Sequence, residues 1–317
     1  MNDHTDPFIP RDKRSIPLRT PGGQTFRHLF QIEDIDAINT AIACTRPLLL
    51  TGEPGVGKTQ LARAAAKATG RALVRYTVDA KTESRDLLWH SDAVARLADA
   101  QVAEARDWSQ SELEKKLASH NYLRPGPLWW AFDWATAKML QKAITPAQDD
   151  GGDPRSGVVV LIDEIDKAEI DVPNGLLEAM GDGSFQPEGW SGRVRMGSVA
   201  PLVVITTNRE RTLPAAFLRR CLAWRLALPE DEGQLREVLV KRGQAHSELD
   251  QELVLGKDAD MLIEDRTAAK DRSARPGLAE YLDLLRAVEE LAKRSGEKPE
   301  RLLERARPYL LRKGSAF

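Results

Sequence analysis

Five short, mainly apolar runs recur along the chain, and turn residues or charged residues bound each of them. They occupy residues 48–50, 72–78, 158–162, 202–206 and 222–228. Runs of this length without regular polar alternation are typical of strands buried on both faces of a parallel sheet. Helical patterns separate them. The sequence therefore predicts an α/β fold, an αβα sandwich around a five-stranded parallel sheet.

Helical spacing marks the flanks of the first run and the whole C-terminal part. Apolar residues recur with a helical period over 32–45, and an alanine-rich segment covers 58–69. After residue 229 the strand patterns stop, and 230–317 carries helical patterns. We expect a core domain over 28–229, a small all-helical lid over 230–317 and a flexible, proline-broken arm over 1–27.

Two segments interrupt the alternation of strands and helices. Residues from about 91 to 127 are charged, alanine-rich and helical in pattern, which indicates an insertion. Residues from about 184 to 199 place glycines and a proline between β-prone residues, which indicates a hairpin or a long loop.

Composition and charge narrow the class of protein. Apolar residues make up 42% and charged residues 30% of the 317 residues, and the formal net charge is -2. This is an ordinary globular balance, and no overall positive field indicates nucleic acid or an anionic membrane as a partner. No apolar run approaches the roughly 18 residues of a membrane span, and the first residues lack the apolar region of a signal peptide. We expect a cytoplasmic protein.

The segment GEPGVGKT matches the phosphate-loop pattern G-x-x-x-x-G-K-[ST] in full. Glycines adopt backbone conformations closed to other residues and bring N–H groups close to phosphate oxygens. The helix that begins near Lys58 directs its positive dipole end at the same anion. Lys58 reaches the β- and γ-phosphates, and the Thr59 hydroxyl binds Mg²⁺. The expected nucleotide-binding residues are Gly52, Glu53, Pro54, Gly55, Val56, Gly57, Lys58, Thr59 and Gln60.

Two carboxylates end the third apolar run, in VVVLIDE. Asp163 is expected to hold Mg²⁺, directly or through water, and Glu164 to act as the general base on the attacking water. Taken alone, a surface acidic turn explains the same residues. The phosphate loop upstream favours the catalytic interpretation. The five histidines form no ligand pair, so we expect no metal site beyond Mg²⁺.

Three further positions are candidates for the same chemistry. Asn208 ends the fourth run and could orient the attacking water, or merely begin a turn. Arg219 and Arg220 end a short helix and could reach a phosphate in a neighbouring subunit, or be a solvated basic helix end. Arg275, in the lid, could touch the γ-phosphate.

In chain order, GEPGVGKT, LIDEIDKA, VITTN, AFLRRC and a lid arginine resemble the motifs of an AAA+ ATPase. The stretches PLLLTGEPGVGKT, YLRPGPLWWAF, LIDEIDKAEIDVPNGLLEAM and TTNRERTLPAAFLRR resemble the MoxR-like branch, over about residues 30–230. The resemblance implies ATP and Mg²⁺ as ligands and a ring assembly, usually a hexamer. It implies Arg220 more naturally than Arg219 as the finger, and Arg275 as the sensor of the lid. It also implies that the insertion and the hairpin face the pore or the surface of the ring.

The resemblance further implies a chaperone-like remodeller of a protein client, often working with a partner that has a von Willebrand factor A domain. No part of this chain resembles that domain, so such a partner would be a separate polypeptide. Two alternatives stay open. A nucleic-acid motor or defence component is opposed by the near-neutral charge and by the lack of a recognised nucleic-acid module. A low-turnover nucleotide switch would not need Glu164 or Asn208.

Overall fold

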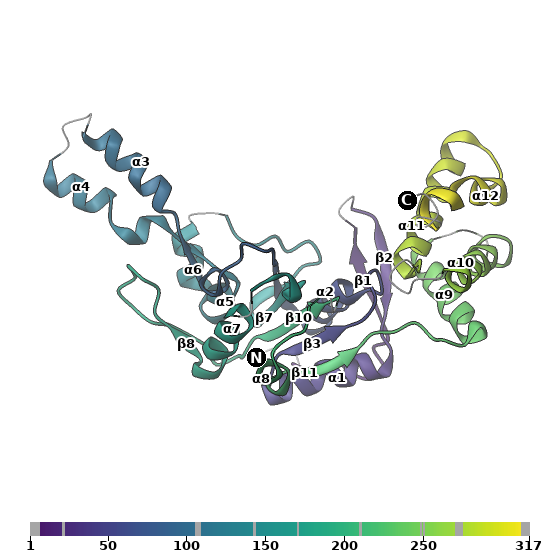
Figure 1. Ribbon diagram of the computed structural model, residues 1–317, viewed down its shortest axis with the longest axis horizontal. Coiled ribbons are helices and arrows are strands. Elements are labelled where there is room, and N and C mark those ends of the chain that lie inside the picture. Colours follow the sequence, from purple (N-terminus) through teal and green to yellow (C-terminus); the bar gives the residue numbers. More distant parts are fainter. Residues whose placement is uncertain are drawn as a thin grey trace, which may run out of the picture. The chain divides into compact units, whose positions relative to one another are not determined.

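The computed structural model describes residues 7–20, 23–104, 109–141, 144–169, 171–208, 211–247, 249, 251–269 and 275–311 (Figure 1). The chain divides into two compact units. The core unit consists of Met1–Ile9, Asp36–Leu49 and Ala65–Ala223, and the loop–lid unit of Pro10–Ile35, Leu50–Ala64 and Trp224–Phe317. The phosphate loop therefore shares a unit with the C-terminal helices. This grouping differs from the expected domain boundaries, which remain a prediction about folding units.

The five apolar runs form one sheet, in the order β11-β3-β10-β7-β4, which confirms the predicted fold class. The strands are β3 (Leu48–Thr51), β4 (Arg71–Thr77), β7 (Asp153–Asp163), β10 (Leu202–Thr207) and β11 (Leu222–Arg225). β7 pairs in parallel with β10 on one side and with β4 on the other. Every residue of β10 is buried, as expected for an inner strand of a parallel sheet. β4 lies at an edge of the sheet.

The two helices predicted around β3 are present. α1 covers Ile32–Cys44, and α2 covers Lys58–Thr69 and begins directly after the phosphate loop. Five alanines make α2 a strong helix former, and Gly70, with a φ of 68°, follows its last residue in a left-handed conformation. The strand–loop–helix order that a phosphate loop requires is therefore in place.

Aromatic side chains fill much of the core unit. The helices α5 (Pro127–Phe132), α6 (Trp134–Gln141) and α7 (Asp171–Asp182) contribute to it. Trp129 is fully buried and meets Phe185 and Trp190 edge to face, with ring centroids 6.1 and 5.5 Å apart. Edge-to-face contacts of this kind add to the free energy of burial and hold α5 in one orientation.

The charged segment before α5 forms a helical hairpin that projects from the rest of the core unit (Figure 1). α3 (Ala93–Glu104) and α4 (Gln110–Lys116) make up the hairpin. The short 3₁₀ helices η1 (Ser84–Leu87) and η2 (Ser119–Tyr122) adjoin it. An antiparallel pair, β5 (Trp89–Ser91) with β6 (Leu123–Pro125), closes its base. The predicted helical pattern of this segment is confirmed. Its orientation toward a ring pore remains a prediction.

A hairpin also forms in the second irregular segment, where the sequence left hairpin and long loop open. β8 (Ser184–Phe185) pairs antiparallel with β9 (Val194–Arg195). Phe185 and Val194 are buried, so the base of this hairpin is anchored in the core unit.

The expected flexible arm over 1–27 is wrong for its second half. β1 (Ser15–Arg19) and β2 (Thr25–Leu29) form an antiparallel hairpin in the loop–lid unit, while residues 1–6 and 21–22 lie outside the described part. Ile16 and Leu18 alternate with exposed residues and are buried, which is the pattern of a half-buried strand. Phe26 stacks on His246 with ring centroids 4.4 Å apart and ties the hairpin to α9 (Glu232–His246).

The described residues of the C-terminal part form helices joined by short loops, and no strand lies among them after β11, as predicted. After α9 come a π-helical turn, η4 (Gln251–Gly256), then α10 (Lys257–Ala268), α11 (Leu278–Ser295) and α12 (Pro299–Leu310). Tyr281, Leu284 and Val288 of α11 are fully buried in a cluster separate from the aromatic core. Among the described helices, none is both long and apolar enough to cross a bilayer.

Candidate functional site

The phosphate loop has the backbone conformation that its glycines predict. Gly52, Gly55 and Gly57 have φ angles of 152°, 75° and 103°, which side chains disfavour. A Cβ atom added to Gly52 would lie 2.2 Å from the carbonyl oxygen of Leu226. The loop therefore needs glycine both for its conformation and for its close approach to the chain after β11.

The ammonium group of Lys58 lies inside the curve of this loop. Lys58 is buried, and its Nζ donates hydrogen bonds to the carbonyl oxygens of Gly52 at 2.8 Å and Glu53 at 3.1 Å. A buried ammonium group needs such partners. The arrangement places a positive charge at the first turn of α2, where backbone N–H groups also favour an anion.

The lid segment contacts the phosphate loop within the loop–lid unit. The backbone N–H of Ala279 donates to the carbonyl of Gly55 at 3.1 Å. Arg266 donates to the carboxylate of Glu53 at 3.0 Å and to the carbonyl of Pro276 at 2.6 Å. Arg266 belongs to none of the motifs recognised in the sequence. Arg275 lies beside Pro276, and its Nε is buried with no hydrogen-bond partner among the described residues.

A cavity of about 310 Å³ adjoins the phosphate loop in the same unit. Gly55, Gly57 and Gln60 form the loop side of it. The other walls come mainly from β2, α9 and α11. They combine apolar residues and histidines with charged residues, namely Phe26, His28, Leu226, His246, Leu278, Ala279, Asp34, Arg63, Arg242, Asp283 and Arg286. Concave, mostly apolar cavities with a few polar groups are the usual form of small-molecule sites.

Two histidines of this cavity are neutral at physiological pH. Burial lowers the pKa of His28 well below its ordinary value, and the positive charge of Arg242 adds to the effect. Burial and Arg242 likewise lower the pKa of His246 to about 4. The Nε2 of His28 is buried and has no hydrogen-bond partner in the described part of the chain. His28 is therefore a polar group available to a ligand, which sequence reasoning missed because no motif contains it.

In the core unit, the polar ends of β7 and β10 lie next to each other. The register pairs Ile205 with Ile162, so Thr206 of β10 stands beside Asp163 of β7. The hydroxyl of Thr206 hydrogen-bonds the carboxylate of Asp163 and accepts a bond from the backbone N–H of Glu164 at 2.9 Å. Thr206, which was not among the site residues expected from the sequence, thus holds both acidic residues.

Glu164 has a left-handed backbone conformation, with φ 61° and ψ 47°. Such a conformation costs a residue other than glycine about 1 kcal/mol or more, and strain of this kind clusters at functional sites. β7 ends at Asp163, directly before this residue, and the 3₁₀ helix η3 (Ile165–Lys167) follows it.

The carboxylate of Glu164 has two neighbours in the core unit. Lys167 donates to its Oε2 at 2.6 Å, and Nδ2 of Asn208 donates to its Oε1 at 3.4 Å. Asn208 is in turn held by its backbone N–H, which donates to Asp166 at 3.2 Å. The structure therefore brings the expected base and the expected water-orienting residue together, and it adds Lys167.

Arg219 and Arg220 end α8 (Ala215–Arg220). Both are exposed, and among the described residues neither guanidinium group has a hydrogen bond or an ion pair. Arg46 donates to the backbone carbonyls of both residues, at 2.5 and 3.0 Å, and so fixes the end of the helix. The helix end is held in place while the two cations face solvent.

The residues expected to bind Mg²⁺ have suitable chemistry for that ion. The hydroxyl of Thr59 and the carboxylate of Asp163 are hard oxygen donors, which Mg²⁺ prefers. Thr59 belongs to the loop–lid unit and Asp163 to the core unit. Within the described residues, no group of three or more histidine, cysteine or acidic side chains offers an alternative metal site.

Comparison with known proteins agrees with this chemistry. The family model described as AAA domain (dynein-related subfamily) matches residues 47–221, just over half of the 317 residues. The matched segment begins before β3 and ends at Cys221, and so includes the phosphate loop, both acidic residues, Asn208 and both arginines of α8. No curated protein matches the sequence significantly.

Proposed function

Because the chain belongs to the dynein-related subfamily of AAA domains, a family of nucleotide-dependent ATPases, we propose that it binds ATP with Mg²⁺ and hydrolyses the γ-phosphate. The observation that carries this proposal is the phosphate loop, in which three glycines have positive φ and the ammonium group of Lys58 lies among loop carbonyls. On binding, Lys58 exchanges these carbonyls for phosphate oxygens, which are stronger acceptors.

Hydrolysis needs a base close to the attacking water. Glu164 is the proposed base, and Asn208 orients the same water because its amide lies beside the Glu164 carboxylate. Thr59 and Asp163 are the residues proposed to hold Mg²⁺, which would supply charge neutralisation to the phosphates of ATP. Thr206 keeps Asp163 and Glu164 in position through its hydroxyl.

The cavity beside the phosphate loop is the proposed site of the purine and ribose. Phe26, Leu226 and Leu278 offer apolar surface to a flat neutral base, and the two histidines of the cavity are uncharged, while charged side chains complete its walls. The Nε2 of His28, which has no hydrogen-bond partner within the described part of the chain, would gain a hydrogen bond to a polar atom of the base. The choice of ATP over GTP is part of the proposal.

We further propose that the protein works as a ring, in the manner of MoxR-like remodellers. Arg220, or Arg219, would reach the γ-phosphate of a neighbouring subunit, and Arg275 would touch it from the lid. The guanidinium groups of Arg219 and Arg220 are exposed and have no hydrogen bond or ion pair among the described residues, which supports this role. The proposed client is a protein, and a partner with a von Willebrand factor A domain is one candidate.

One observation favours the second candidate function, a nucleotide-dependent switch with low turnover. The ammonium of Lys167 occupies one oxygen of the Glu164 carboxylate at 2.6 Å, and a base held in an ion pair is a poor acceptor of a water proton. In this state the chain would bind ATP, and hydrolysis of the bound ATP would require a partner.

Binding of a fluorescent ATP analogue to the purified chain tests the proposed site. Lys58→Ala should lose binding by a factor of 100 or more, because a phosphate-binding ammonium is removed. Lys67→Ala, on the same helix, is the matched control and should bind as the wild type does. Equal binding by wild type and Lys58→Ala would contradict the proposed nucleotide site.

A further inference from the structure

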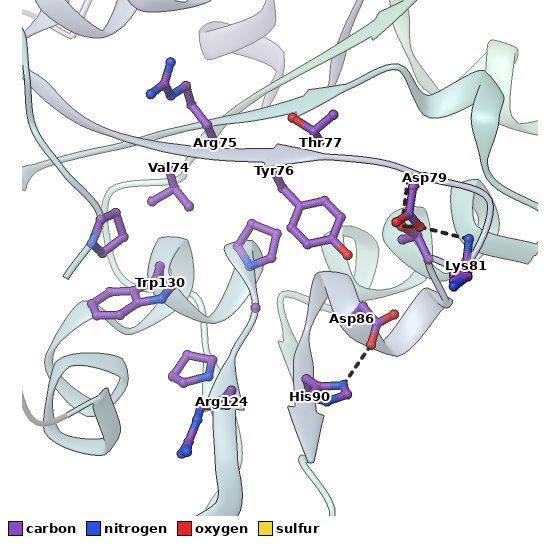
Figure 2. Close-up of a pocket in the computed structure, with 15 residues that line it drawn as sticks. Val74, Arg75, Tyr76, Thr77, Asp79, Lys81, Asp86, His90, Arg124 and Trp130 are labelled. Carbon is purple, nitrogen blue, oxygen red and sulfur yellow. Dashed lines mark hydrogen bonds and ion pairs between the residues drawn. The ribbon is translucent and has the colours of Figure 1, made fainter. Parts of the chain in front are cut away.

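β4 is an edge strand with an open outer side, and a cavity of about 620 Å³ lies along it (Figure 2). The cavity belongs entirely to the core unit. Four consecutive residues of the strand, 74–77, line one side of it. The opposite side comes from β6, the start of α5 and the loop around residue 146. None of the roles proposed above uses this cavity.

The side chain of Gln148 shows which backbone groups of β4 face outward. Its amide accepts from the N–H of Leu73 at 2.8 Å and donates to the carbonyl of Leu73 at 2.9 Å, as a neighbouring strand would. In a parallel sheet both backbone groups of one residue point to the same side, and the side alternates along the strand. The backbone groups of Arg75 and Thr77 therefore also point away from β7.

Nothing in the described residues pairs with these outward groups. The N–H and carbonyl groups of Arg75 and Thr77 make no hydrogen bond outside the sheet, and both residues are exposed. An unpaired row of N–H and carbonyl groups on an edge strand is a template for another extended chain. Gln148 pairs with Leu73, and the outward backbone groups without a described partner begin at the next outward residue, Arg75.

The wall of the cavity opposite β4 offers few backbone N–H groups to a bound chain. Pro125, Pro127 and Pro146 line it and have no backbone N–H to donate. Figure 2 shows Val74 and Tyr76 extending from β4 on the side where Trp130 and Arg124 lie, whereas Arg75 and Thr77 extend from the other face of the strand. An extended ligand on β4 would thus place alternate side chains against aromatic and proline surfaces.

Charges around the cavity favour an acidic ligand. Asp79 accepts hydrogen bonds from the Lys81 N–H and the Thr82 hydroxyl, at 2.9 and 3.0 Å. Asp86 accepts from the N–H of Glu83 at 2.8 Å and lies 3.4 Å from His90. The carboxylates of Asp79 and Asp86 therefore already have hydrogen-bond or ion-pair partners within the chain.

Three cations line the cavity, and Arg75 lies 3.9 Å from the carboxylate of Asp149, whereas Lys81 and Arg124 have fewer partners. In the described part of the chain, the Lys81 ammonium has no ion pair, and Arg124 donates to a backbone carbonyl at 3.4 Å. Because the acids are satisfied and the cations are available, a carboxylate on the ligand would be favoured here.

We propose that the open edge of β4 binds an extended segment of a partner polypeptide by strand addition, with an apolar side chain in the Tyr76–Trp130 cavity and a neighbouring carboxylate near Lys81 or Arg124. Main-chain hydrogen bonds to Arg75 and Thr77 supply affinity, and the cavity supplies side-chain preference. The site is separate from the phosphate loop, and its occupation does not require ATP hydrolysis. Thr77 pairs with Asp163 in the sheet, so a bound segment lies one strand away from the proposed Mg²⁺ ligand.

The test uses the full chain without nucleotide and a library of displayed random heptapeptides. Selected peptides are synthesised with a fluorescent label, and their Kd is measured for wild type, Arg75→Pro and Arg75→Ala. Proline removes the outward N–H and is tolerated on an edge strand, where no ladder bond is lost. Alanine removes the side chain and keeps the N–H. We expect Arg75→Pro to weaken binding tenfold or more, and Arg75→Ala by no more than about twofold.

A second probe keeps the test valid if Arg75→Pro folds poorly by circular dichroism. Peptides N-methylated at alternate residues lose donors without changing side chains, and one of the two methylation patterns should abolish binding to wild type. Failure to select any peptide, equal binding by Arg75→Pro, or indifference to both methylation patterns would overturn the proposal.

Salt-sensitive binding of oligothymidine that survives in Arg75→Pro and is lost in Arg124→Ala would instead assign the cavity to nucleic acid. Lys58→Ala should bind these peptides normally, so failure here is distinct from failure of the ATPase proposal.

Discussion

Lys167 and Glu164 form an ion pair three residues apart, with 2.6 Å between Nζ and Oε2, across the turn that ends β7. The pair is possible because Glu164 adopts a left-handed conformation and the residues after it form a single 3₁₀ turn. Both side chains are partly exposed, at 41% for Lys167 and 31% for Glu164, so solvent screens the pair. A pair of this kind is worth about 0.5–1 kcal/mol.

Removing this ion pair should accelerate basal ATP hydrolysis. Lys167→Ala frees the carboxylate to accept a proton from water, and the pair's free energy corresponds to a rise in kcat of about two- to fivefold. Steady-state phosphate release measures it. Lys167→Arg keeps the charge and is the control, with kcat near that of wild type. A lower kcat for Lys167→Ala would show that Lys167 assists the reaction instead.

The exposed arginines of α8 should act across subunits. Arg220→Ala should bind ATP normally and lose turnover by about 10³-fold, because a transition-state charge partner is removed. Mixing it with Lys58→Ala should restore part of the activity, since each mixed interface can combine an intact arginine with an intact phosphate loop. Arg219→Ala is the comparison variant. An inactive mixture would argue against a trans-acting Arg220.

The helical lid should lose stability as pH rises. Asp258 is fully buried in α10, neither carboxylate oxygen has a hydrogen-bond partner among the described residues, and burial raises its pKa to about 8. The unfolded chain releases this proton near pH 4, whereas the folded lid keeps it up to about pH 8. Stability is therefore fully present below about pH 4, and it falls by about 1.4 kcal/mol per pH unit until about pH 8.

Replacing the buried carboxyl removes this pH dependence. Thermal melts of Asp258→Asn should show little change in the lid transition between pH 5 and pH 8, and the variant should exceed wild type at pH 8 by roughly 3–5 kcal/mol. Asp260→Asn, an exposed neighbour paired with Arg236, is the control and should follow wild type. Parallel pH profiles for wild type and Asp258→Asn would refute the assignment.

Elements set by local pattern were predictable from the sequence, and elements set by distant contacts were not. The strand runs, the phosphate loop and the helical lid each carry their own apolar or glycine pattern. The β1–β2 hairpin was missed because Pro17 lies inside β1, and a proline argues against a strand unless it is an edge strand. The ion pair of Lys167 depends on the left-handed conformation of Glu164, and no residue pattern in the sequence predicts that conformation.

Residues whose roles depend on contacts between distant segments could not be predicted from the sequence either. His28 lies in the cavity beside the phosphate loop because the hairpin packs on α9, and Gln148 completes the edge of β4 from a loop 75 residues away. Neither residue belongs to a motif. Their roles come from packing that brings separate stretches of chain to one place.

ATP hydrolysis as a function of protein concentration, for wild type beside Glu164→Gln, tests the central claim most directly. Glu164→Gln keeps the size of the side chain and removes its basicity, so it should bind ATP and turn over at least 100-fold more slowly. We predict that the specific activity of wild type rises as the chain assembles and that Glu164→Gln is inactive at every concentration. Wild-type rates in Glu164→Gln, or nucleotide binding with no hydrolysis by wild type at any concentration, would contradict an assembly-dependent ATPase in which Glu164 is the base.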